Sequence, residues 1–390
     1  MSNFTVTNTT QIYFGKGTEE LIGRLAAQYG TTDTVMLVTY QGNPLKDIVD
    51  RLRNSIEAEG LKCVEYAEAV PNPLLDKARE GIEIARKNNA GLLIGIGGGS
   101  CIDMAKAIAA GVNCKSDLWD LYTGKAAPVD VLPIGAVTTL AGTGSESSPY
   151  AVLTNTETQQ KIGFGVQETR PKFAILNPEF TYGVNAYQTA CGSCDMFAHI
   201  LDDYLGRSTD MPLSYRICES VMRTVAEFAP IAIKDPTNYT ARAQLLHAGT
   251  MAMGKLATMG LDTNLGLHTM AEDLGAVYNV THGAALSVLI PAWMTYLKSE
   301  KQALLARFAK EVWNIEVDAG DVEKTIDLGI ARTKEFFVSL GLPVTLKELG
   351  IDFEKDGRML ADRMAKKGDY GDAYISLTPE IAYSVYEMSK

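Results

Sequence analysis

The N-terminal half contains the stretch Ile94-Gly95-Ile96-Gly97-Gly98-Gly99-Ser100, and the fold expected for this half follows from it. A short apolar run that ends in glycines and continues as a helical pattern, here to Gly111, indicates a buried strand, a tight turn and a helix. Such glycines let the backbone approach a phosphate, and the helix N-terminus offers unpaired N–H donors. Ser100 is a suitable cap for that helix. The stretch therefore predicts either a pyrophosphate site or a tight turn that needs glycine for its backbone conformation alone.

The glycine spacing separates this stretch from two other phosphate motifs. It is not the strict G-x-G-x-x-G fingerprint, and no Gly-Lys-Ser or Gly-Lys-Thr follows, which disfavours an NTPase. A second loop, residues 138–146, follows another strand and is dense in hydroxyl groups and small residues. Two such loops at the carboxyl ends of parallel strands suit the binding of a dinucleotide. The alternative interpretation of the second loop is a plain surface loop. Within it, Thr138, Thr139 and Thr143 are candidates to bond phosphate or ribose oxygens.

Apolar runs and helical patterns alternate on both sides of the glycine stretch. Continuous apolar strands that alternate with helices predict a parallel sheet covered on both faces. Residues 150–153 and 161–164 flank a turn-like stretch and are expected to form a hairpin. The other strands are expected at residues 35–38, 63–66, 91–96, 131–137 and 173–176, and helices at residues 44–59, 75–89 and 100–111.

The pattern changes near residue 187 and is mainly helical from there on. A length of 390 residues also favours two domains over a single core. We therefore expect an α/β, Rossmann-like parallel-sheet domain at residues 1–187 and an all-helical domain at residues 188–390.

Composition excludes several classes of function. The formal charge of -11 and the pI of about 5.0 disfavour nucleic-acid binding, which needs clustered Lys and Arg. No apolar stretch is long enough for a membrane span, and the N-terminus lacks the apolar region of a secretory signal. Six scattered cysteines suggest reduced thiols in a cytoplasmic protein. Of these, Cys191 and Cys194 form a CxxC pair, for which two small buried residues are favoured over a redox or zinc site.

Only four histidines occur, and three of them are candidates for a metal site. Asp195 and His199 are four residues apart on an expected helix, so their side chains lie on one face. His268 begins another helical stretch, and His282 precedes a long apolar one. One carboxylate and three imidazoles suit Fe²⁺ or Zn²⁺. The alternative for Asp195 and His199 is an exposed polar helix face, and the alternative for His268 and His282 is two core histidines. The fourth, His247, is expected to be a packed helix residue.

Taken together, these residues resemble the iron-containing (group III) alcohol dehydrogenase family, in particular its butanol-dehydrogenase-like branch. The resemblance covers essentially the whole chain. It is carried by residues 12–17, Gly97-Gly98-Gly99-Ser100 with Asp103 and Lys106, residues 138–146 and 171–178, the set Asp195, His199, His268 and His282, and residues 340–343 and 377–380.

The resemblance implies an N-terminal nucleotide-binding domain and a helical domain that binds metal and substrate, often in a homodimer. It implies that Asp195, His199, His268 and His282 bind a divalent metal, Fe²⁺ or Zn²⁺. The cofactor would be NAD(P)H. The residues expected to bind it are Gly97, Gly98, Gly99, Ser100, Asp103, Thr138, Thr139, Thr143, Lys161 and Tyr40.

Two positions depart from the family pattern. Many relatives carry a further histidine four residues after the third ligand, where this chain has Glu272, which could move protons or repel anionic substrates. A surface glutamate on a helix is the alternative. Some NAD-specific relatives have an aspartate after the second strand, where this chain has Tyr40-Gln41-Gly42-Asn43. These residues include no acidic side chain that would exclude NADP and no arginine that would attract it. The choice between NAD and NADP therefore stays open, with a slight preference for NADP.

The expected activity is hydride transfer between the nicotinamide cofactor and a small primary alcohol or aldehyde. The metal would act as a Lewis acid on the substrate oxygen, and water, a ribose hydroxyl or Glu272 would relay the proton. One alternative is a dehydroquinate-synthase-type lyase, which would need Lys and Arg clustered near the metal. A second is a non-catalytic nucleotide-binding module.

Overall fold

The computed structural model describes residues 3–207, 210–262, 266–365 and 376–390. The chain divides into two compact units. The N-terminal unit is Thr7–Val184, and the helical unit combines Asn185–Lys390 with the short segment that precedes Thr7. Within the helical unit, the ring of Phe4 from that segment lies against Gly260, where a Cβ atom would be only 2.8 Å from it.

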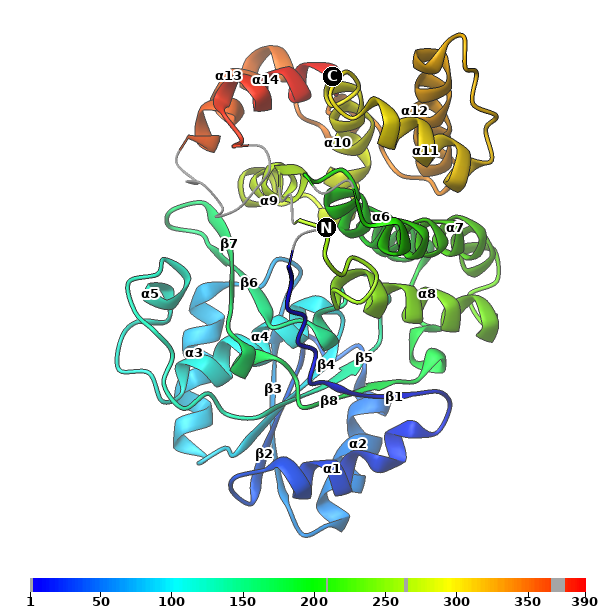
Figure 1. Ribbon diagram of the computed structural model, residues 1–390. Helices are drawn as coiled ribbons and strands as arrows, with labels where there is room; N and C mark the ends of the chain where they lie inside the picture. The colour runs from blue at the N-terminus through cyan, green and yellow to red at the C-terminus, as the bar shows by residue number, and fades with distance from the viewer. Residues whose placement is uncertain (1–2, 208–209, 263–265, 366–375) are drawn as a thin grey trace. The chain divides into compact units, whose positions relative to one another are not determined.

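A six-stranded sheet with the order β1-β8-β5-β4-β2-β3 forms the framework of the N-terminal unit (Figure 1). Every neighbouring pair of strands is parallel, which confirms the predicted fold class. Only β5 begins clearly later than predicted, because Pro133 has no N–H to donate to a neighbouring strand. The strands are β1 (Gln11–Phe14), β2 (Thr34–Tyr40), β3 (Lys62–Ala69), β4 (Leu92–Gly97), β5 (Ile134–Thr138) and β8 (Phe173–Leu176).

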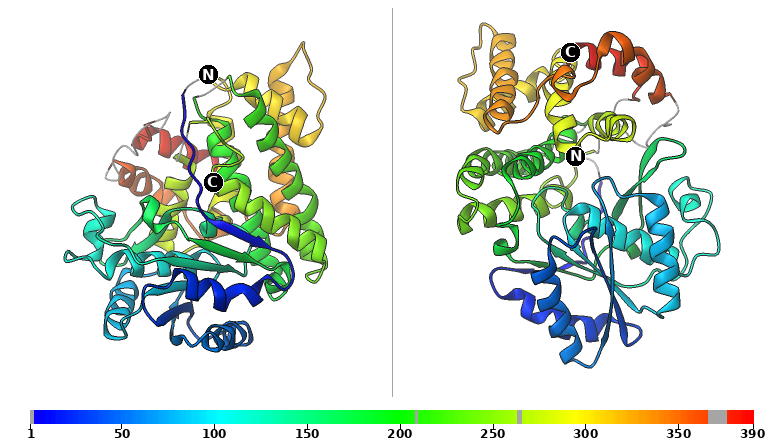
Figure 2. Two further views of the ribbon diagram at one scale, coloured as in Figure 1. Left: turned by 60° about the horizontal axis from the view of Figure 1, so that its bottom comes forward. Right: turned by 180° about the vertical axis from the view of Figure 1, so that it is seen from behind.

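Helices cover both faces of this sheet, because alternate residues of each buried strand point to opposite sides. Val35 and Leu37 of β2 pack with α1 and α2, whereas Met36 and Val38 pack with α3 and α4. Figure 2 shows these helices in two further views. The helices of this unit are α1 (Ile22–Tyr29), α2 (Lys46–Ala58), α3 (Leu75–Lys87), α4 (Gly99–Gly111) and α5 (Leu118–Tyr122).

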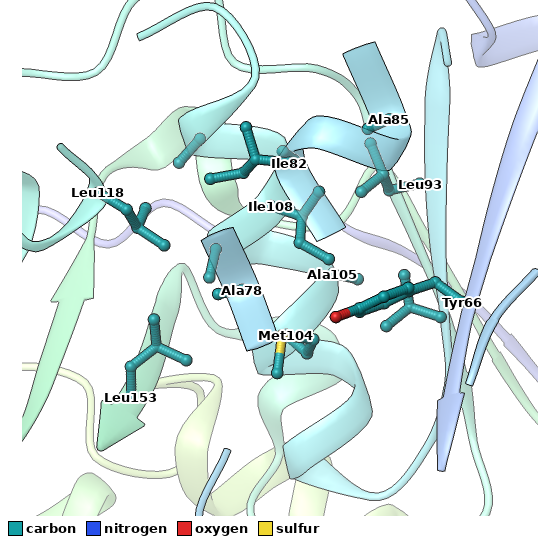
Figure 3. Close-up of a cluster of buried hydrophobic side chains, with 14 of the residues drawn as sticks. Tyr66, Ala78, Ile82, Ala85, Leu93, Met104, Ala105, Ile108, Leu118 and Leu153 are labelled. Carbon is teal, nitrogen blue, oxygen red and sulfur yellow. The ribbon is translucent and has the colours of Figure 1, made fainter. Parts of the chain in front are cut away.

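The core on the α3 and α4 side holds α4 firmly against the sheet. Tyr66, Ile82, Met104 and Ile108 are all 5% exposed or less and gather in one apolar cluster (Figure 3). Burying a large apolar side chain of this kind contributes roughly 1.5–3 kcal/mol. The glycine turn before α4 is therefore built on a rigid base.

A hairpin lies between β5 and β8 in the chain, as predicted. β6 (Tyr150–Asn155) pairs antiparallel with β7 (Gln160–Gly165), and Leu153 of β6 joins the α4 core. Short 3-10 helices connect the larger elements. They are η1 (Thr18–Leu21), η2 (Ser145–Ser147), η3 (Gln167–Thr169), η4 (Pro178–Thr181) and, in the helical unit, η5 (Lys347–Leu349).

The helical unit packs around α6 and α10, which are buried along most of their length. None of the described helices is long and apolar enough to span a bilayer. The helices of this unit are α6 (Ala186–Tyr204), α7 (Pro212–Lys234), α8 (Tyr239–Met253), α9 (Gly266–Tyr278), α10 (His282–Tyr296), α11 (Gln302–Trp313), α12 (Val322–Ser339), α13 (Phe353–Met364) and α14 (Pro379–Met388).

Candidate functional site

The glycine turn joins β4 to α4 through three glycines with different roles. Gly97 has a φ of 150°, which side-chain-bearing residues rarely adopt. Gly98 is the N-cap of α4, and no side chain caps the helix there. The prediction that Ser100 is the N-cap is wrong, because the helix begins one residue earlier and Ser100 lies inside its first turn.

Two side chains predicted to bind the cofactor close over this turn. The Tyr40 hydroxyl accepts a 3.0 Å hydrogen bond from the Gly98 N–H, and a Cβ on Gly98 would lie 2.8 Å from that oxygen. A Cβ on Gly99 would lie 2.6 Å from Thr143. Burial raises the pKa of Tyr40, so its hydroxyl stays neutral. The structure thus brings Tyr40, the glycines and Thr143 together, and only glycine fits between them.

The same end of the sheet fits an anionic ligand. The first N–H groups of a helix have no partner within the helix, and α4 lacks a side-chain cap. Thr138, at the end of β5, is 2% exposed and its hydroxyl has no hydrogen-bond partner among the described residues. The neighbouring Thr139 donates its N–H to the Gly97 carbonyl at 2.9 Å, which ties the two loops together. This cradle matches the demands of a pyrophosphate group.

Asp103 is engaged with the protein itself. Its carboxylate accepts hydrogen bonds from the Ser145 hydroxyl at 2.6 Å and the Val152 N–H at 3.0 Å. Lys106, fully buried, donates to the carbonyl and hydroxyl of Ser145, each at 2.7 Å. Burial raises the pKa of Asp103 and lowers that of Lys106 to about 8. These contacts anchor the second loop and the hairpin to α4, while a direct role of Asp103 toward a cofactor stays a prediction.

Lys161 is buried and has a half-buried partner that its local sequence does not indicate. Its ammonium group donates a 2.9 Å hydrogen bond to the Asn72 side-chain oxygen. Asn72 has a φ of 55°, in the left-handed region where asparagine is favoured among side-chain-bearing residues. The sequence does single out this position, because Asn72 lies between Pro71 and Pro73 in the loop after β3.

Three imidazoles surround one carboxylate oxygen in the helical unit. The Nε2 atoms of His199, His268 and His282 lie 3.9, 3.9 and 3.7 Å from Asp195 Oδ1. The ligand atoms of Asp195, His268 and His282 lie within 4.8 Å of one another, whereas His199 falls outside this tighter group. The rings of His199 and His268 are stacked at 4.5 Å. Residues from three different helices therefore converge on one point, as the metal hypothesis required.

Asp202 fixes the orientation of His268. Its Oδ2 atom lies 2.6 Å from His268 Nδ1, and both residues are buried. If Nδ1 carries the proton for this hydrogen bond, Nε2 keeps its lone pair on the side of Asp195. Burial acts to lower the pKa of His268, but the hydrogen bond to Asp202 and the carboxylates of Asp195 and Glu272 outweigh it and raise this pKa. Burial and the neighbouring His268 lower the pKa of His199.

Gly283 brings His282 into the cluster. A Cβ atom at this position would lie 2.1 Å from the Cys191 carbonyl oxygen, so only glycine lets the start of α10 approach the backbone of α6. Cys191 is one helical turn before Asp195. Cys191 and Cys194 are free and buried, and burial raises the pKa of Cys191 to about 12. The prediction of two small buried residues is therefore confirmed.

The cluster fits a divalent cation. His268 Nε2 is buried and has no hydrogen-bond partner among the described residues, which costs free energy unless a ligand occupies it. Nitrogen and carboxylate donors of this kind suit Fe²⁺ or Zn²⁺. Glu272 is half-buried on α9, one turn after His268. His247 lies apart from the cluster and is exposed on α8, so the prediction that it is a packed residue is wrong.

The glycine turn and the buried cluster together define the class of oxidoreductases that combine a metal with a dinucleotide. Comparison with family models makes the assignment specific. A model described as iron-containing alcohol dehydrogenase matches residues 9–178, and one described as Fe-containing alcohol dehydrogenase family, C-terminal, matches residues 189–387. The chain therefore belongs to the iron-containing alcohol dehydrogenase family.

Named relatives cover the full length of the chain. The NADH-dependent butanol dehydrogenase A of Clostridium acetobutylicum is 35% identical over 395 residues, which cover 100% of this chain and 99% of the relative. The NADPH-dependent aldehyde reductase YqhD of Escherichia coli is 31% identical over 100% of both chains. The crystal structure of an NADH-dependent butanol dehydrogenase A from Thermotoga maritima has a TM-score of 0.93 at 32% identity, covering 100% and 99% of the two chains.

Proposed function

We propose that this chain is a metal-dependent, NAD(P)-linked alcohol dehydrogenase and aldehyde reductase that acts on a small primary alcohol or aldehyde. The observation that carries the proposal is the convergence of three imidazole Nε2 atoms on Asp195 Oδ1. The substrate class is supported by the names of the relatives, which are butanol dehydrogenases and an aldehyde reductase. Those names disfavour both the lyase and the non-catalytic module.

In the helical unit, Asp195, His199, His268 and His282 would hold Fe²⁺ or Zn²⁺. When bound, such an ion supplies Lewis-acid polarisation of the substrate oxygen. Asp202 holds the His268 ring through Nδ1 and keeps Nε2 directed toward Asp195. The carboxylate of Glu272, one turn further along α9, would accept or return the proton that the alcohol exchanges.

In the N-terminal unit, residues of the glycine turn and the second loop would bind the cofactor. The dinucleotide supplies the hydride when bound. The backbone N–H groups at the start of α4 would hold the pyrophosphate, Thr138 and Thr139 would offer hydroxyls, and the Lys161 ammonium would donate to a ribose oxygen. The division of labour at residue 187, with cofactor residues before it and metal residues after it, belongs to the same proposal.

A homodimer is part of the proposal as well. The strand β1 lies at the edge of the sheet and pairs with β8 alone among the described strands. Ile12 and Phe14 on this strand are 39% and 42% exposed. An apolar sheet edge of this kind favours association with another chain.

The test of the proposed function is aldehyde-dependent oxidation of NADH and NADPH. Protein stripped of metal and reloaded with Fe²⁺ or Zn²⁺ should reduce short-chain aldehydes, and the stripped protein should not. A reloaded protein that binds metal and cofactor but consumes neither cofactor with any such aldehyde would contradict the proposal.

Replacing Asp202 should weaken metal binding without unfolding the protein. We expect Asp202→Asn to lower the affinity for Zn²⁺ roughly 10- to 100-fold, because loss of a carboxylate partner disturbs the tautomer and orientation of a ligand histidine. Competition with a chromophoric chelator measures the affinity. Asp203→Asn is the matched control, since Asp203 is equally buried but pairs with Lys255. Equal Zn²⁺ affinities of the two variants would count against a positioning role for Asp202.

A further inference from the structure

The end of β2 lies directly beside the glycine turn. Tyr40, its last residue, accepts the hydrogen bond from Gly98, and the next residue, Gln41, donates its N–H to the Ala69 carbonyl at the end of β3. The chain after β2 thus runs between the proposed pyrophosphate site and the end of β3. In doubly wound sheets an acidic residue on this side of the pyrophosphate binds the adenosine ribose hydroxyls of NAD.

This chain places a carboxylate there from β3 instead of β2. The Oε2 atom of Glu68 accepts a 3.2 Å hydrogen bond from the Gln41 side-chain amide. The same atom lies 3.1 Å from the Lys77 ammonium. Glu68 is only partly exposed, so its charge is screened less by water than that of a fully exposed group. The sequence shows nothing acidic after β2 because this carboxylate comes from a neighbouring strand.

The positively charged side chains near Glu68 for which the structure gives contacts are already paired with carboxylates. Lys77 contacts both Glu68 and Glu80, and Arg53 is paired with Glu65. The 2′-phosphate of NADP is a dianion that a carboxylate beside the ribose would repel, whereas ribose hydroxyls donate hydrogen bonds that a carboxylate accepts.

We propose that Glu68, held by Gln41, is the specificity-determining residue that makes this site favour NAD(H) over NADP(H). The inference rests on the proposed function, because it requires the dinucleotide to lie on the glycine turn. It replaces the slight preference for NADP that the residues after β2 suggested.

The test measures binding rather than turnover. Isothermal titration calorimetry of the full chain would compare NADH with NADPH, and 5′-AMP with 2′,5′-ADP, which differ only in the 2′-phosphate. The wild type should bind the unphosphorylated member of each pair more tightly. For each pair we take the ratio of the Kd of the phosphorylated ligand to the Kd of the unphosphorylated one. Glu68→Gln should lower this ratio about tenfold by tightening the binding of the phosphorylated ligand, because one nearby negative charge is removed.

Glu80→Gln is the matched control, since Glu80 is the other carboxylate that contacts Lys77. This substitution should leave the Kd ratios of both ligand pairs unchanged. Ratios that are the same in Glu68→Gln and the wild type would overturn the inference while leaving the nucleotide site intact. A wild type that prefers NADPH, and loses that preference in Lys77→Ala, would also overturn it. If none of the four ligands binds, the nucleotide part of the proposed function fails together with the inference.

Discussion

His268→Ala should abolish the aldehyde reductase activity. The substitution removes the Nε2 atom, which has no hydrogen-bond partner among the described residues, together with the ring that stacks on His199. Lewis-acid polarisation is worth several kcal/mol, so losing about 4 kcal/mol lowers kcat/KM roughly a thousandfold. Steady-state rates with a short-chain aldehyde measure this, and metal analysis after dialysis shows whether the ion has been lost.

His247→Ala is the control for this experiment, because it removes an exposed imidazole outside the cluster. It should keep both the bound metal and the rate. Activity of His268→Ala within tenfold of the wild type, at equal protein concentration, would mean that the cluster is not the catalytic centre.

Gly283→Ala should damage both stability and metal binding. Its Cβ would lie 2.1 Å from the Cys191 carbonyl oxygen, a backbone atom that no rotamer change can move away. The start of α10 must then shift away from α6, which carries Asp195. Overpacking of this severity costs about 3 kcal/mol, and we expect a loss of metal affinity of at least about 100-fold. Urea unfolding of the metal-free protein and titration with Zn²⁺ separate the two effects.

Gly183→Ala provides the comparison, since an added Cβ there has nothing within 4 Å. Its free energy of unfolding should stay within roughly 0.5 kcal/mol of the wild type, as for other surface changes. If Gly283→Ala behaves like Gly183→Ala, close approach of the two helices does not set the position of His282.

Most of the fold could be predicted from the sequence because buried strands and amphipathic helices leave strong periodic patterns. The run at β4 and the helical pattern of α4 are such cases, and the hairpin β6–β7 followed from its turn-like residues. The predictions of the fold that are wrong concern the ends of elements, where neighbouring residues compete for the same position. Ser100 is a good capping residue, but Gly98 reaches the cap position because the chain turns earlier.

The site was harder to predict wherever a partner acts through space. Asp195 and His199 are four residues apart, so helical geometry alone places them together. The distance from His268 to Asp202 is 66 residues in sequence, and no local pattern indicates their hydrogen bond. The same limit applies to Gly283, whose importance depends on a carbonyl of another helix. Glu68 lies on β3 and contacts Gln41 only through space, so the residues that follow β2 in the sequence do not indicate it.

The chain enters the N-terminal unit after Val6 and leaves it after Val184, so the helical unit is discontinuous in sequence. During synthesis on the ribosome, the segment with Phe4 is made before the N-terminal unit, whereas Gly260, against which its ring lies, is made after that unit is complete. The N-terminal unit can thus fold cotranslationally, while the segment waits for its partner. A gene fragment that starts at Asn185 would encode a helical unit without this segment. Supplying the segment as a separate peptide would show how much of that unit's stability depends on it.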